Sequence, residues 1–515
     1  MKVDTKNKEE IKYLLKQALI NQAYELECLF GVDFTGNNHL TDKQFEKVIS
    51  RINGKKEFIT NNPYEKLLIS FPNDSKFNDL RITITGYQAI DLYCKQEKLD
   101  NIMRYTSFEK KTRVNDKVFR VNIPDYQLRF NQKKEISVDV NSSLVRECMQ
   151  QWENLLKVFR YKKQYSYQTL DKEFSIDCAI VKTSSVETKE LSIEQVLKQG
   201  LEKQVLKPEE ERIPYKEWWF SVKKKPETLV KVKDVNKYYK SIKESNLFNN
   251  VFSYEVEVEY LGNKKVGVKK DFIDSKDDDK TKLVQSTFIN YFRYIGIILQ
   301  CLQDSFYLMS QIEFFKVVKS YTTLIGAKGL SNMKQIFFGP LPVDLDKNKI
   351  IQYDDYVYQN PDRVYESGNI LLDYCVTDKS DGVRNLLFVA EDGECYLIGR
   401  DSISLMKKVG IKIPKYAMSI FDGEYLEVDK DREYFNKYMI FDAYFINGKN
   451  IMRLPFGDGK GGEKERLGNI NHFVKTYVEG SNILLKDGTK SASNKYQFKI
   501  DKKTFLFGES SCLLY

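Results

Sequence analysis

Two short acidic segments lie near the start and the end of the first half of the chain. Glu25 and Glu27 are separated by one residue, and Glu255, Glu257 and Glu259 repeat the same spacing. Alternate side chains of a β-strand share a face, so each set is expected to point to one side of its strand. Carboxylates held side by side repel each other, and hard cations such as Mg²⁺ or Mn²⁺ offset that repulsion. We therefore predict that these five glutamates bind a divalent metal.

Basic residues alternate in the same way on other segments of this half. Arg81 lies in LRITIT, Arg160 and Lys162 share a face in VFRYKK, and Lys182 ends a segment that also carries Asp177. Lys182 and Asp177 have opposite parity, so both would point inward only at a bulge or a strand end. A single glutamate pair is usually the solvated face of an antiparallel sheet. The acidic and basic segments together favour a closed barrel around a polar tunnel, in which a metal is held and phosphate is bound by Arg81, Arg160, Lys162 and Lys182.

The second half contains the segment VTDKSDGVR at Val376–Arg384. A lysine amine can attack the α-phosphate of a nucleotide and retain the nucleoside monophosphate as a phosphoramidate, once burial or neighbouring cations lower its pKa. Lys379 is the candidate nucleophile, and Arg384 is a candidate phosphate ligand. A lone segment of this type is more often a surface turn. Here it stands between two apolar segments, LLDYCVTD and NLLFVA, and this context favours the catalytic interpretation.

The composition excludes several other chemistries. The 515 residues include only two histidines, so a His-ligated zinc site or a Ser-His-Asp triad is not expected. The cysteines form no CxxC pair, which indicates free thiols rather than a disulfide framework. The N-terminus has no apolar signal-peptide core, and polar residues interrupt the apolar stretch Tyr291–Met309, which favours a buried helix over a membrane span. The formal net charge of +9 is compatible with an anionic partner.

The apolar patterns divide the chain into two modules. A helix and then short alternating segments occupy the first module, whereas residues 283–320 have helical periodicity and strand-like segments return after residue 370. Polar stretches at Lys203–Lys225 and Asp271–Lys282 are predicted to be linkers, the second of them a hinge. We predict an α+β fold with an antiparallel β tunnel of about eight strands in residues 1–270, and antiparallel sheets flanked by helices in residues 271–515.

These motifs resemble those of two enzyme families. YELE at Tyr24–Glu27 and YEVEVE at Tyr254–Glu259 are similar to the metal-binding glutamate motifs of triphosphate tunnel metalloenzymes, and LRITITG, FRYKK and IDCAIVK are similar to their interior basic strands. KSDGVR is similar to the KxDGxR element of covalent nucleotidyltransferases, and SIFDGEY and YMIFDAYF follow in the order of that family. The resemblance implies a nucleotidyltransferase domain in which Lys379 carries the nucleotide, bound by Asp381, Gly382, Arg384, Arg400, Glu424 and Phe441.

Together the two halves resemble the mRNA capping enzymes of large cytoplasmic DNA viruses, of the asfarvirus and mimivirus kind. The resemblance implies an RNA 5′-triphosphatase that removes the γ-phosphate with Mg²⁺ or Mn²⁺. It also implies a guanylyltransferase that passes GMP from GTP through lysyl-GMP to diphosphate RNA. The implied partners are 5′-triphosphate RNA, GTP, and a viral RNA polymerase or methyltransferase subunit, with no membrane. The implied location is the host cytoplasm or the virion, as a soluble protein.

The last part of the sequence departs from this family pattern. A later DG-type motif, a lysine-rich motif and an OB domain cannot be placed, because Asp487-Gly488 lies in a polar context typical of a turn. The segment NKYQFKIDKKTF is a candidate for the strand that leads to the lysine-rich motif. We expect a fragment without a methyltransferase and with impaired guanylyl transfer. Two alternatives stay open: an ATP-dependent, ligase-like nucleotidyltransferase with an N-terminal nucleic-acid-binding module, and a non-catalytic scaffold.

Overall fold

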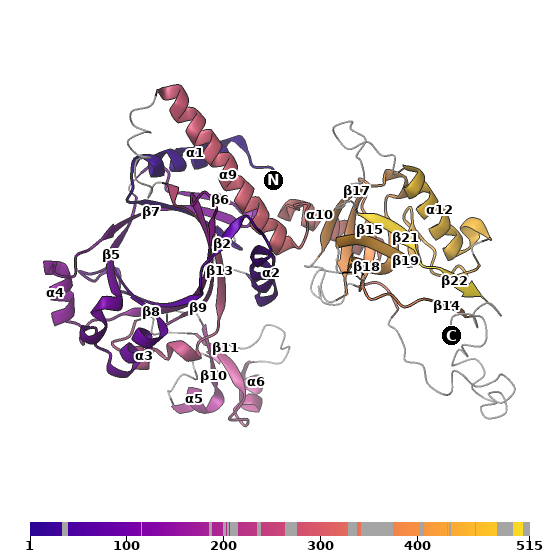
Figure 1. The fold of residues 1–515 in the computed structure, drawn as a ribbon. Helices are drawn as coiled ribbons and strands as arrows, with labels where there is room; N and C mark the ends of the chain where they lie inside the picture. The colour runs from indigo at the N-terminus through magenta and orange to yellow at the C-terminus, as the bar shows by residue number, and fades with distance from the viewer. Residues whose placement is uncertain are drawn as a thin grey trace. The chain divides into compact units, whose positions relative to one another are not determined.

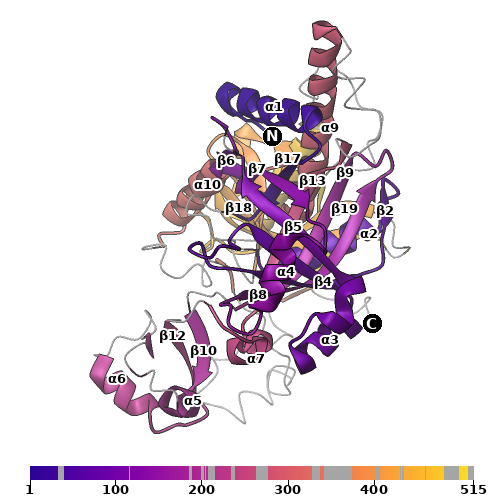
Figure 2. The same ribbon diagram turned by 90° about the vertical axis from the view of Figure 1, so that its left-hand side faces the viewer.

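The chain divides into two compact units, Met1–Leu302 and Gln303–Tyr515. Figures 1 and 2 show each unit from two directions. The computed structural model describes residues 1–32, 40–114, 116–184, 188–198, 202, 205–206, 215–233, 238–262, 276–327, 337–340, 374–400, 406–429, 431, 434–458, 460–480 and 498–507.

A closed antiparallel barrel forms the centre of the first unit (Figure 1). Within the described residues its sheet has ten strands, of which β2 (Phe58–Thr60) and β6 (Arg120–Ile123) lie beside the ring of the other eight. The pairing of β1 with β7 closes that ring. The predicted tunnel of about eight strands is therefore confirmed. In order around the barrel the strands are β1 (Tyr24–Phe30), β13 (Ser253–Tyr260), β9 (Phe174–Thr183), β8 (Val158–Thr169), β3 (Tyr64–Ser70), β4 (Leu80–Thr85), β5 (Thr106–Arg113) and β7 (Leu128–Ser137).

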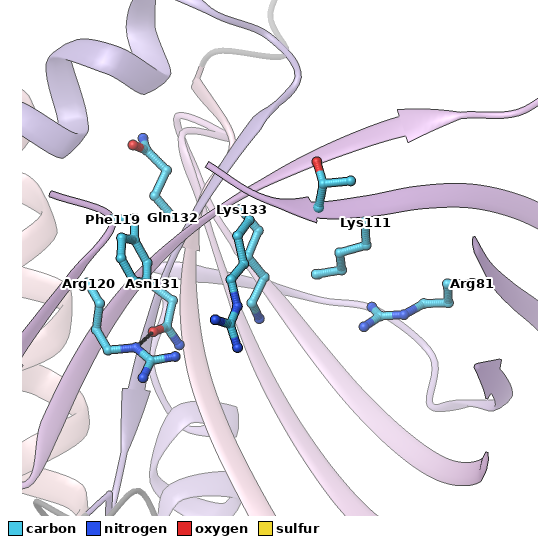
Figure 3. A pocket seen from close by; sticks show the side chains of 9 residues that line it. Arg81, Lys111, Phe119, Arg120, Asn131, Gln132 and Lys133 are labelled. Carbon is cyan, nitrogen blue, oxygen red and sulfur yellow. Dashed lines mark hydrogen bonds between the residues drawn. The ribbon is translucent and has the colours of Figure 1, made fainter. Parts of the chain in front are cut away.

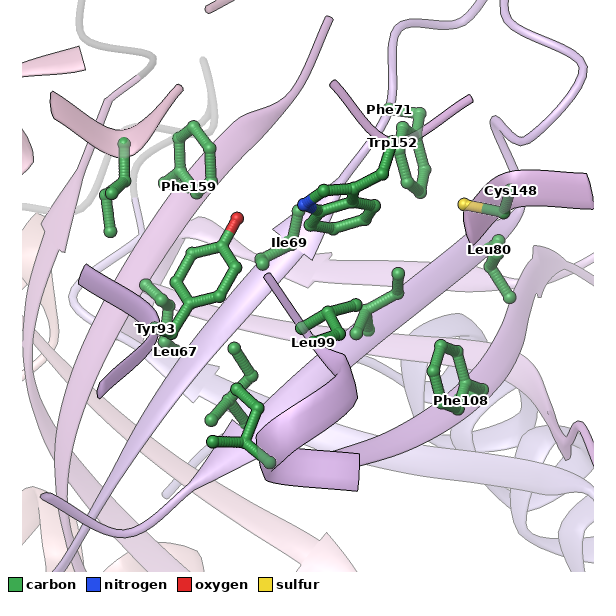
Figure 4. Close-up of a cluster of buried hydrophobic side chains, with 14 of the residues drawn as sticks. Leu67, Ile69, Phe71, Leu80, Tyr93, Leu99, Phe108, Cys148, Trp152 and Phe159 are labelled. Carbon is green, nitrogen blue, oxygen red and sulfur yellow. The ribbon is translucent and has the colours of Figure 1, made fainter. Parts of the chain in front are cut away.

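Alternate side chains of each strand point away from the tunnel, and apolar ones among them form clusters on the outer face of the barrel. Leu67 and Ile69 of β3 and Ile82 of β4 are fully buried in one such cluster (Figure 4). The helices α3 (Tyr87–Gln96) and α4 (Ser143–Gln150) contribute to the same cluster. Shorter elements complete the unit: α2 (Asp42–Asn53), α7 (Ile242–Ser245) and the 3-10 turns Asp100–Tyr105, Pro124–Tyr126 and Leu247–Asn249.

The long helix α9 (Asp277–Gln303) packs on the barrel, as does α1 (Thr5–Ile20). The buried Tyr291 hydroxyl donates to the Val258 carbonyl at 2.8 Å, and its ring centroid lies 5.1 Å from that of Phe174. These contacts join α9 to the first unit, so the division between the units falls later than the predicted boundary after residue 270. Residues 271–275 of the expected hinge lie outside the described residues. The rest of it is corrected, because Asp277–Lys282 forms the first turns of α9, where acidic residues suit the helix N-terminus.

A small module interrupts the chain between β9 and β13. Its strands β10 (Thr188–Ser192), β12 (Leu229–Lys233) and β11 (Val205–Leu206) form a separate sheet beside α5 (Ile193–Lys198) and α6 (Tyr215–Val222). Trp218 of α6 is buried against Ile193 and Val230. The polar linker predicted at Lys203–Lys225 is therefore wrong, because this stretch supplies a strand and a helix to a hydrophobic core.

The second unit is a sheet of seven strands, within the described residues, covered by a helix on each face. Leu386 and Phe388 pack toward α10, whereas Leu387 and Val389 pack toward α12, as the two-residue period of a strand requires. The predicted α+β architecture is confirmed. The elements are α10 (Gln311–Leu324), β14 (Cys375–Thr377), β15 (Val383–Val389), β16 (Glu394–Gly399), β17 (Lys407–Lys412), β18 (Ser419–Val428), β19 (Tyr434–Ile446), β20 (Lys449–Asn450), α12 (Arg466–Gly480), β21 (Lys499–Lys502), β22 (Phe505–Phe507) and the 3-10 turns Pro414–Tyr416 and Gly462–Lys464.

None of the helices in the described ranges combines the length and the apolar character needed to cross a lipid bilayer.

Candidate functional site

Carboxylates lie on the inner face of three adjacent barrel strands. Glu27 of β1 is directly opposite Glu259 of β13, and Glu257 of β13 is directly opposite Asp177 of β9. The carboxylate of Asp177 is fixed by the Gln164 amide at 2.8 Å. Like charges in such cross-strand positions destabilise a sheet. We call Glu27, Glu257, Glu259 and Asp177 the acidic wall; it contains three of the glutamates predicted from the sequence.

Cations lie on the inner face of the strands that complete the ring. The sequence predicted Arg160 and Lys162 of β8 and Arg81 of β4, and the structure adds Lys111 of β5 and Lys133 of β7. We call these five residues the basic wall. Sequence reasoning missed the two lysines because each stands beside a second lysine of opposite parity, in FEKKTR and NQKKEIS. Only the strand register decides which lysine of each pair points inward.

Glu255 is held by the basic wall. Arg160 Nη2 contacts one of its carboxylate oxygens, and Lys162 Nζ lies 3.0 Å from the other. Burial alone would raise the pKa of Glu255, but these two cations hold it at about 2. Glu255 is therefore ionised and ion-paired, although the sequence predicted it as a metal ligand.

A second set of ion pairs joins β1 to the basic wall. Lys111 Nζ lies 2.6 Å from Glu25 and also contacts Glu135. Burial lowers the pKa of Lys111, but the neighbouring carboxylates raise it to about 12. Glu27 accepts a hydrogen bond from Lys133. Glu25 thus shares Lys111 with the neighbouring carboxylate of Glu135 and, like Glu255, is ion-paired with the basic wall.

The surroundings of Glu257 oppose the ionisation of its carboxyl group. Burial first, and then the charges of Glu27, Asp177 and Glu255, raise its pKa to about 7 against the opposing effect of Lys162. Among the described residues, no group of three or more Asp, Glu, His or Cys side chains lies close enough together to coordinate a metal ion as it stands. The donor set still fits a hard divalent cation, because hard oxygen ligands that repel one another are what such a cation stabilises.

Lys182 does not join this cluster. It lies opposite Tyr161 on the outward-pointing parity of β9 and donates to the Phe248 carbonyl. Its ammonium group lies 4.2 Å from the centroid of the Phe252 ring. The prediction that Lys182 binds phosphate in the tunnel is therefore corrected, because β9 has no bulge that would turn both Asp177 and Lys182 inward.

In the second unit Lys379 follows β14 on an exposed loop. Its amine lies 2.7 Å from Asp381, and the two side chains are 86% and 94% exposed. The hydrogen bond to Asp381, and then its charge, raise the pKa of Lys379. In this geometry the amine holds its proton, so a nucleophilic role requires that Asp381 be displaced from it.

Glu424 ties the loop to the sheet. One carboxylate oxygen accepts from the Gly382 N–H at 2.8 Å, and the other lies 2.9 Å from Lys503 Nζ. A Cβ at Gly382 would lie 2.7 Å from both the Glu424 side chain and the Tyr425 carbonyl, so this position requires glycine. Lys503 also donates to the Asp378 carbonyl at 3.2 Å. Through these contacts both Glu424 of β18 and Lys503, near the end of the described residues, reach the loop that carries Lys379.

Sequence reasoning missed Lys503. The strand β21 runs parallel to β19, β22 pairs with β14, and Lys503 stands between β21 and β22. Its side chain is only 7% exposed. The signal in the sequence was the pair of lysines in KIDKKTF, within the stretch expected to lead to a lysine-rich motif. Asp487-Gly488 lies outside the described residues.

Arg384 is anchored in the sheet beneath an aromatic surface. It donates to Asp422 at 2.5 and 3.1 Å, and the Tyr444 hydroxyl donates to the same carboxylate at 2.5 Å. Its guanidinium lies 5.6 Å from the Phe441 ring centroid, where the sequence placed the stacking aromatic. Arg400 is exposed and directly follows β16. Because Gly399 pairs with Asn385 on β15, the next residue, Arg400, lies across from Arg384.

Comparisons with known proteins give one family-model match and several similar solved structures. The model of the mRNA capping enzyme, catalytic domain, matches residues 370–513, which associates the second unit with mRNA capping. No curated protein matches the chain. Among solved structures, the mimivirus capping enzyme triphosphatase has 15% identity over 57% of this chain and 98% of its own, with a TM-score of 0.31. The S. pombe Pct1 RNA triphosphatase has 13% identity over 58% of this chain and 94% of its own, with a TM-score of 0.30.

Proposed function

We propose that the chain acts in the first two steps of mRNA capping and that the barrel is an RNA 5′-triphosphatase. The observation that carries this proposal is the closed tunnel in which an acidic wall faces a basic wall. A triphosphate brings several negative charges, which match the cations, and a hydrolytic reaction needs a positioned water. A polar tunnel of both signs is otherwise costly to enclose, because even paired charges lose their hydration on burial.

The reaction in the tunnel transfers the γ-phosphoryl group to water. A new bond forms between water oxygen and the γ-phosphorus, the bond to the β,γ-bridging oxygen breaks, and the products are diphosphate RNA and inorganic phosphate. Arg81, Arg160 and Lys162 bind the phosphate oxygens and offset their charge in the transition state. Glu27, Glu257, Glu259 and Asp177 would hold a divalent cation, which supplies charge neutralisation when bound.

We further propose that the second unit is the guanylyltransferase. Lys379 Nζ, once deprotonated, forms a bond with the α-phosphorus of GTP, and pyrophosphate leaves. The β-phosphate oxygen of diphosphate RNA then attacks the same phosphorus, and the Lys379 amine is released. Arg384 binds phosphate, Phe441 stacks on the base, and Glu424 and Lys503 hold the loop that carries Lys379. The family-model match over residues 370–513 supports this assignment.

The test is release of the γ-phosphate from 5′-triphosphorylated RNA with Mg²⁺ or Mn²⁺. The wild-type protein is compared with Glu257→Ala and with Glu153→Ala, which removes an exposed carboxylate outside the barrel. We expect metal-dependent release that falls roughly 100-fold in Glu257→Ala, since a lost cation ligand removes several kcal/mol of charge stabilisation. No release with either metal from folded protein would contradict the tunnel assignment. It would then favour a ligase-like enzyme with an N-terminal binding module.

A further inference from the structure

A cavity of about 190 Å³ opens on the inner side of the barrel where β7 passes from one partner strand to another (Figure 3). β5 ends at the pair Arg113–Lys133, and β6 begins at the pair Arg120–Asn131. The short interruption between β5 and β6 leaves the cavity at their junction. Its lining residues are Arg81, Lys111, Thr112, Arg113, Phe119, Arg120, Asn131, Gln132 and Lys133.

The charge of this cavity favours an anion. Arg81, Lys111, Arg113, Arg120 and Lys133 supply five cations, and no carboxylate is among the described residues that line it. Lys111 and Lys133 are the same lysines that reach Glu25 and Glu27, so the cavity shares two of its cations with the ion pairs of the tunnel. Arg113 and Arg120 are exposed. Guanidinium groups of this kind bind phosphate in a bidentate manner.

The cavity also carries one aromatic ring. The Arg120 guanidinium lies 5.8 Å from the centroid of Phe119, and the Phe119 carbonyl accepts from the Gln132 N–H at 2.8 Å. Arg120 donates to Asn131 at 3.0 Å, and Asn131 donates to Glu27 at 3.3 Å. This hydrogen-bonded chain fixes the aromatic end of the cavity relative to the acidic wall. An aromatic face beside arginines is the usual platform for a nucleic-acid base and its backbone.

The size of the cavity limits what it can hold. Pockets for whole drug-sized ligands start at about 300 Å³. A smaller cavity that shares its lysines with a charged tunnel suits one end of a longer ligand whose other end lies in the tunnel. A nucleotide attached to a triphosphate is such a ligand.

We propose that this cavity is the subsite for the first transcribed nucleotide of the RNA, which deepens and rests on the proposed triphosphatase function. Phe119 stacks on the first base, and Arg113 and Arg120 bind the phosphodiester that joins the first two nucleotides. The basic and acidic walls hold the triphosphate beyond it. The cavity therefore distinguishes an RNA 5′ end from a bare polyphosphate.

The test compares three substrates that share the triphosphate. Inorganic tripolyphosphate lacks the base, ATP has a base without a following phosphodiester, and 5′-triphosphorylated RNA has both. We expect Phe119→Ala to lower kcat/KM roughly tenfold for ATP and RNA, the loss of one stacked base, with tripolyphosphate changed less than about twofold. We expect Arg120→Gln to lower kcat/KM roughly tenfold for RNA alone.

Matched controls remove an aromatic or a cation from outside the cavity. Phe220→Ala removes an exposed ring of the small module, and Lys163→Gln removes an exposed lysine from the outer face of β8. Both controls should leave all three substrates unchanged. Equal losses on the three substrates, or no loss on any, would overturn the subsite. A wild-type protein that releases no phosphate from RNA would overturn the proposed function and the subsite with it, a result distinct from equal losses in the variants.

Discussion

The two units hold their candidate reactive groups in opposite ways. In the barrel the charges are largely buried and already paired across strands, as in the contact of Lys162 with Glu255 at 3.0 Å. In the second unit Lys379 is 86% exposed, and its partner Asp381 is 94% exposed. A closed sheet fixes its inner side chains through register alone, so the barrel site is preorganised. A nucleophile on an exposed loop is instead positioned by the bound ligand and by the segments that contact the loop.

The pKa shifts express the same difference. Glu255 and Glu257 stand two residues apart on one strand, yet the pKa of Glu255 lies at about 2 and that of Glu257 at about 7, because they face different walls. The pKa of Lys379 is raised by Asp381, its neighbour on the same loop. In the barrel, burial and the charges on neighbouring strands thus give two glutamates different pKa values. In the second unit, the pKa of Lys379 is set mainly by its contact with Asp381 on the same loop.

The largest expected effect is the loss of covalent nucleotide labelling in Lys379→Ala. With radiolabelled GTP the wild-type protein should form an adduct that survives denaturation and base but is cleaved by acid, as a phosphoramidate is, and the variant should fall to background, because the proposed intermediate has a single attachment atom. Lys415→Ala, which removes an exposed lysine, should retain labelling. Phosphate release by the barrel should be unchanged in both variants, which would show that the two units react independently.

Two other results would redirect this comparison. Labelling of Lys379 with ATP instead of GTP would favour the ligase-like alternative. Folded wild-type protein that accepts neither nucleotide would favour the non-catalytic scaffold for the second unit, whatever the activity of the barrel.

A smaller difference is expected between two lysines of opposite parity in the barrel. Lys162→Gln should reduce triphosphatase kcat/KM roughly 100-fold, because it removes a preorganised cation from the tunnel. Lys182→Gln should change it less than about twofold, because Lys182 lies on the outer face beside Phe252. Phosphate release under single-turnover conditions measures both. An equal loss in the two variants would break the assignment of inner and outer faces.

The smallest effect concerns stability in metal-free buffer with a chelator. The folded pKa of Glu257 is raised above its unfolded value, so its ionised form costs stability above about pH 7 and costs nothing below about pH 4.5. Glu257→Gln should therefore raise the barrel Tm at pH 8 but not near pH 4.5. The groups that face Glu257 are Glu27, Asp177, Glu255 and Lys162.

Glu255→Gln provides the matched control of opposite sign. The folded pKa of Glu255 is lowered, so its contribution is present above about pH 4.5 and is lost as the pH falls through about 2. This variant should lower the Tm at pH 8, with a shift of roughly 2 °C for each kcal/mol in a unit of this size. Thermal melts followed by circular dichroism measure both variants. The same sign of shift in the two would contradict the separation of the walls.

The outline of the fold could be predicted because periodicity is local. The alternation in LRITIT and YEVEVE depends on neighbouring residues only, and the structure places both segments on barrel strands. The polar linker predicted at Lys203–Lys225 was wrong because Trp218 finds its apolar partners on β10, α5 and β12, which are distant in sequence. The expected hinge was wrong in part because the acidic run at Asp277 begins a helix whose packing residues lie further along the chain.

The sequence by itself determined the types of the reactive groups: the paired glutamates, the interior arginines and the KSDG segment around Lys379. It did not determine which of them meet. Only the tertiary structure paired Glu257 with Asp177, turned Lys111 and Lys133 inward and Lys182 outward, and brought Lys503 to the loop of Lys379. The physical reason is that residue type and spacing act along the chain, whereas register, closure of the barrel and burial arise between strands far apart in sequence.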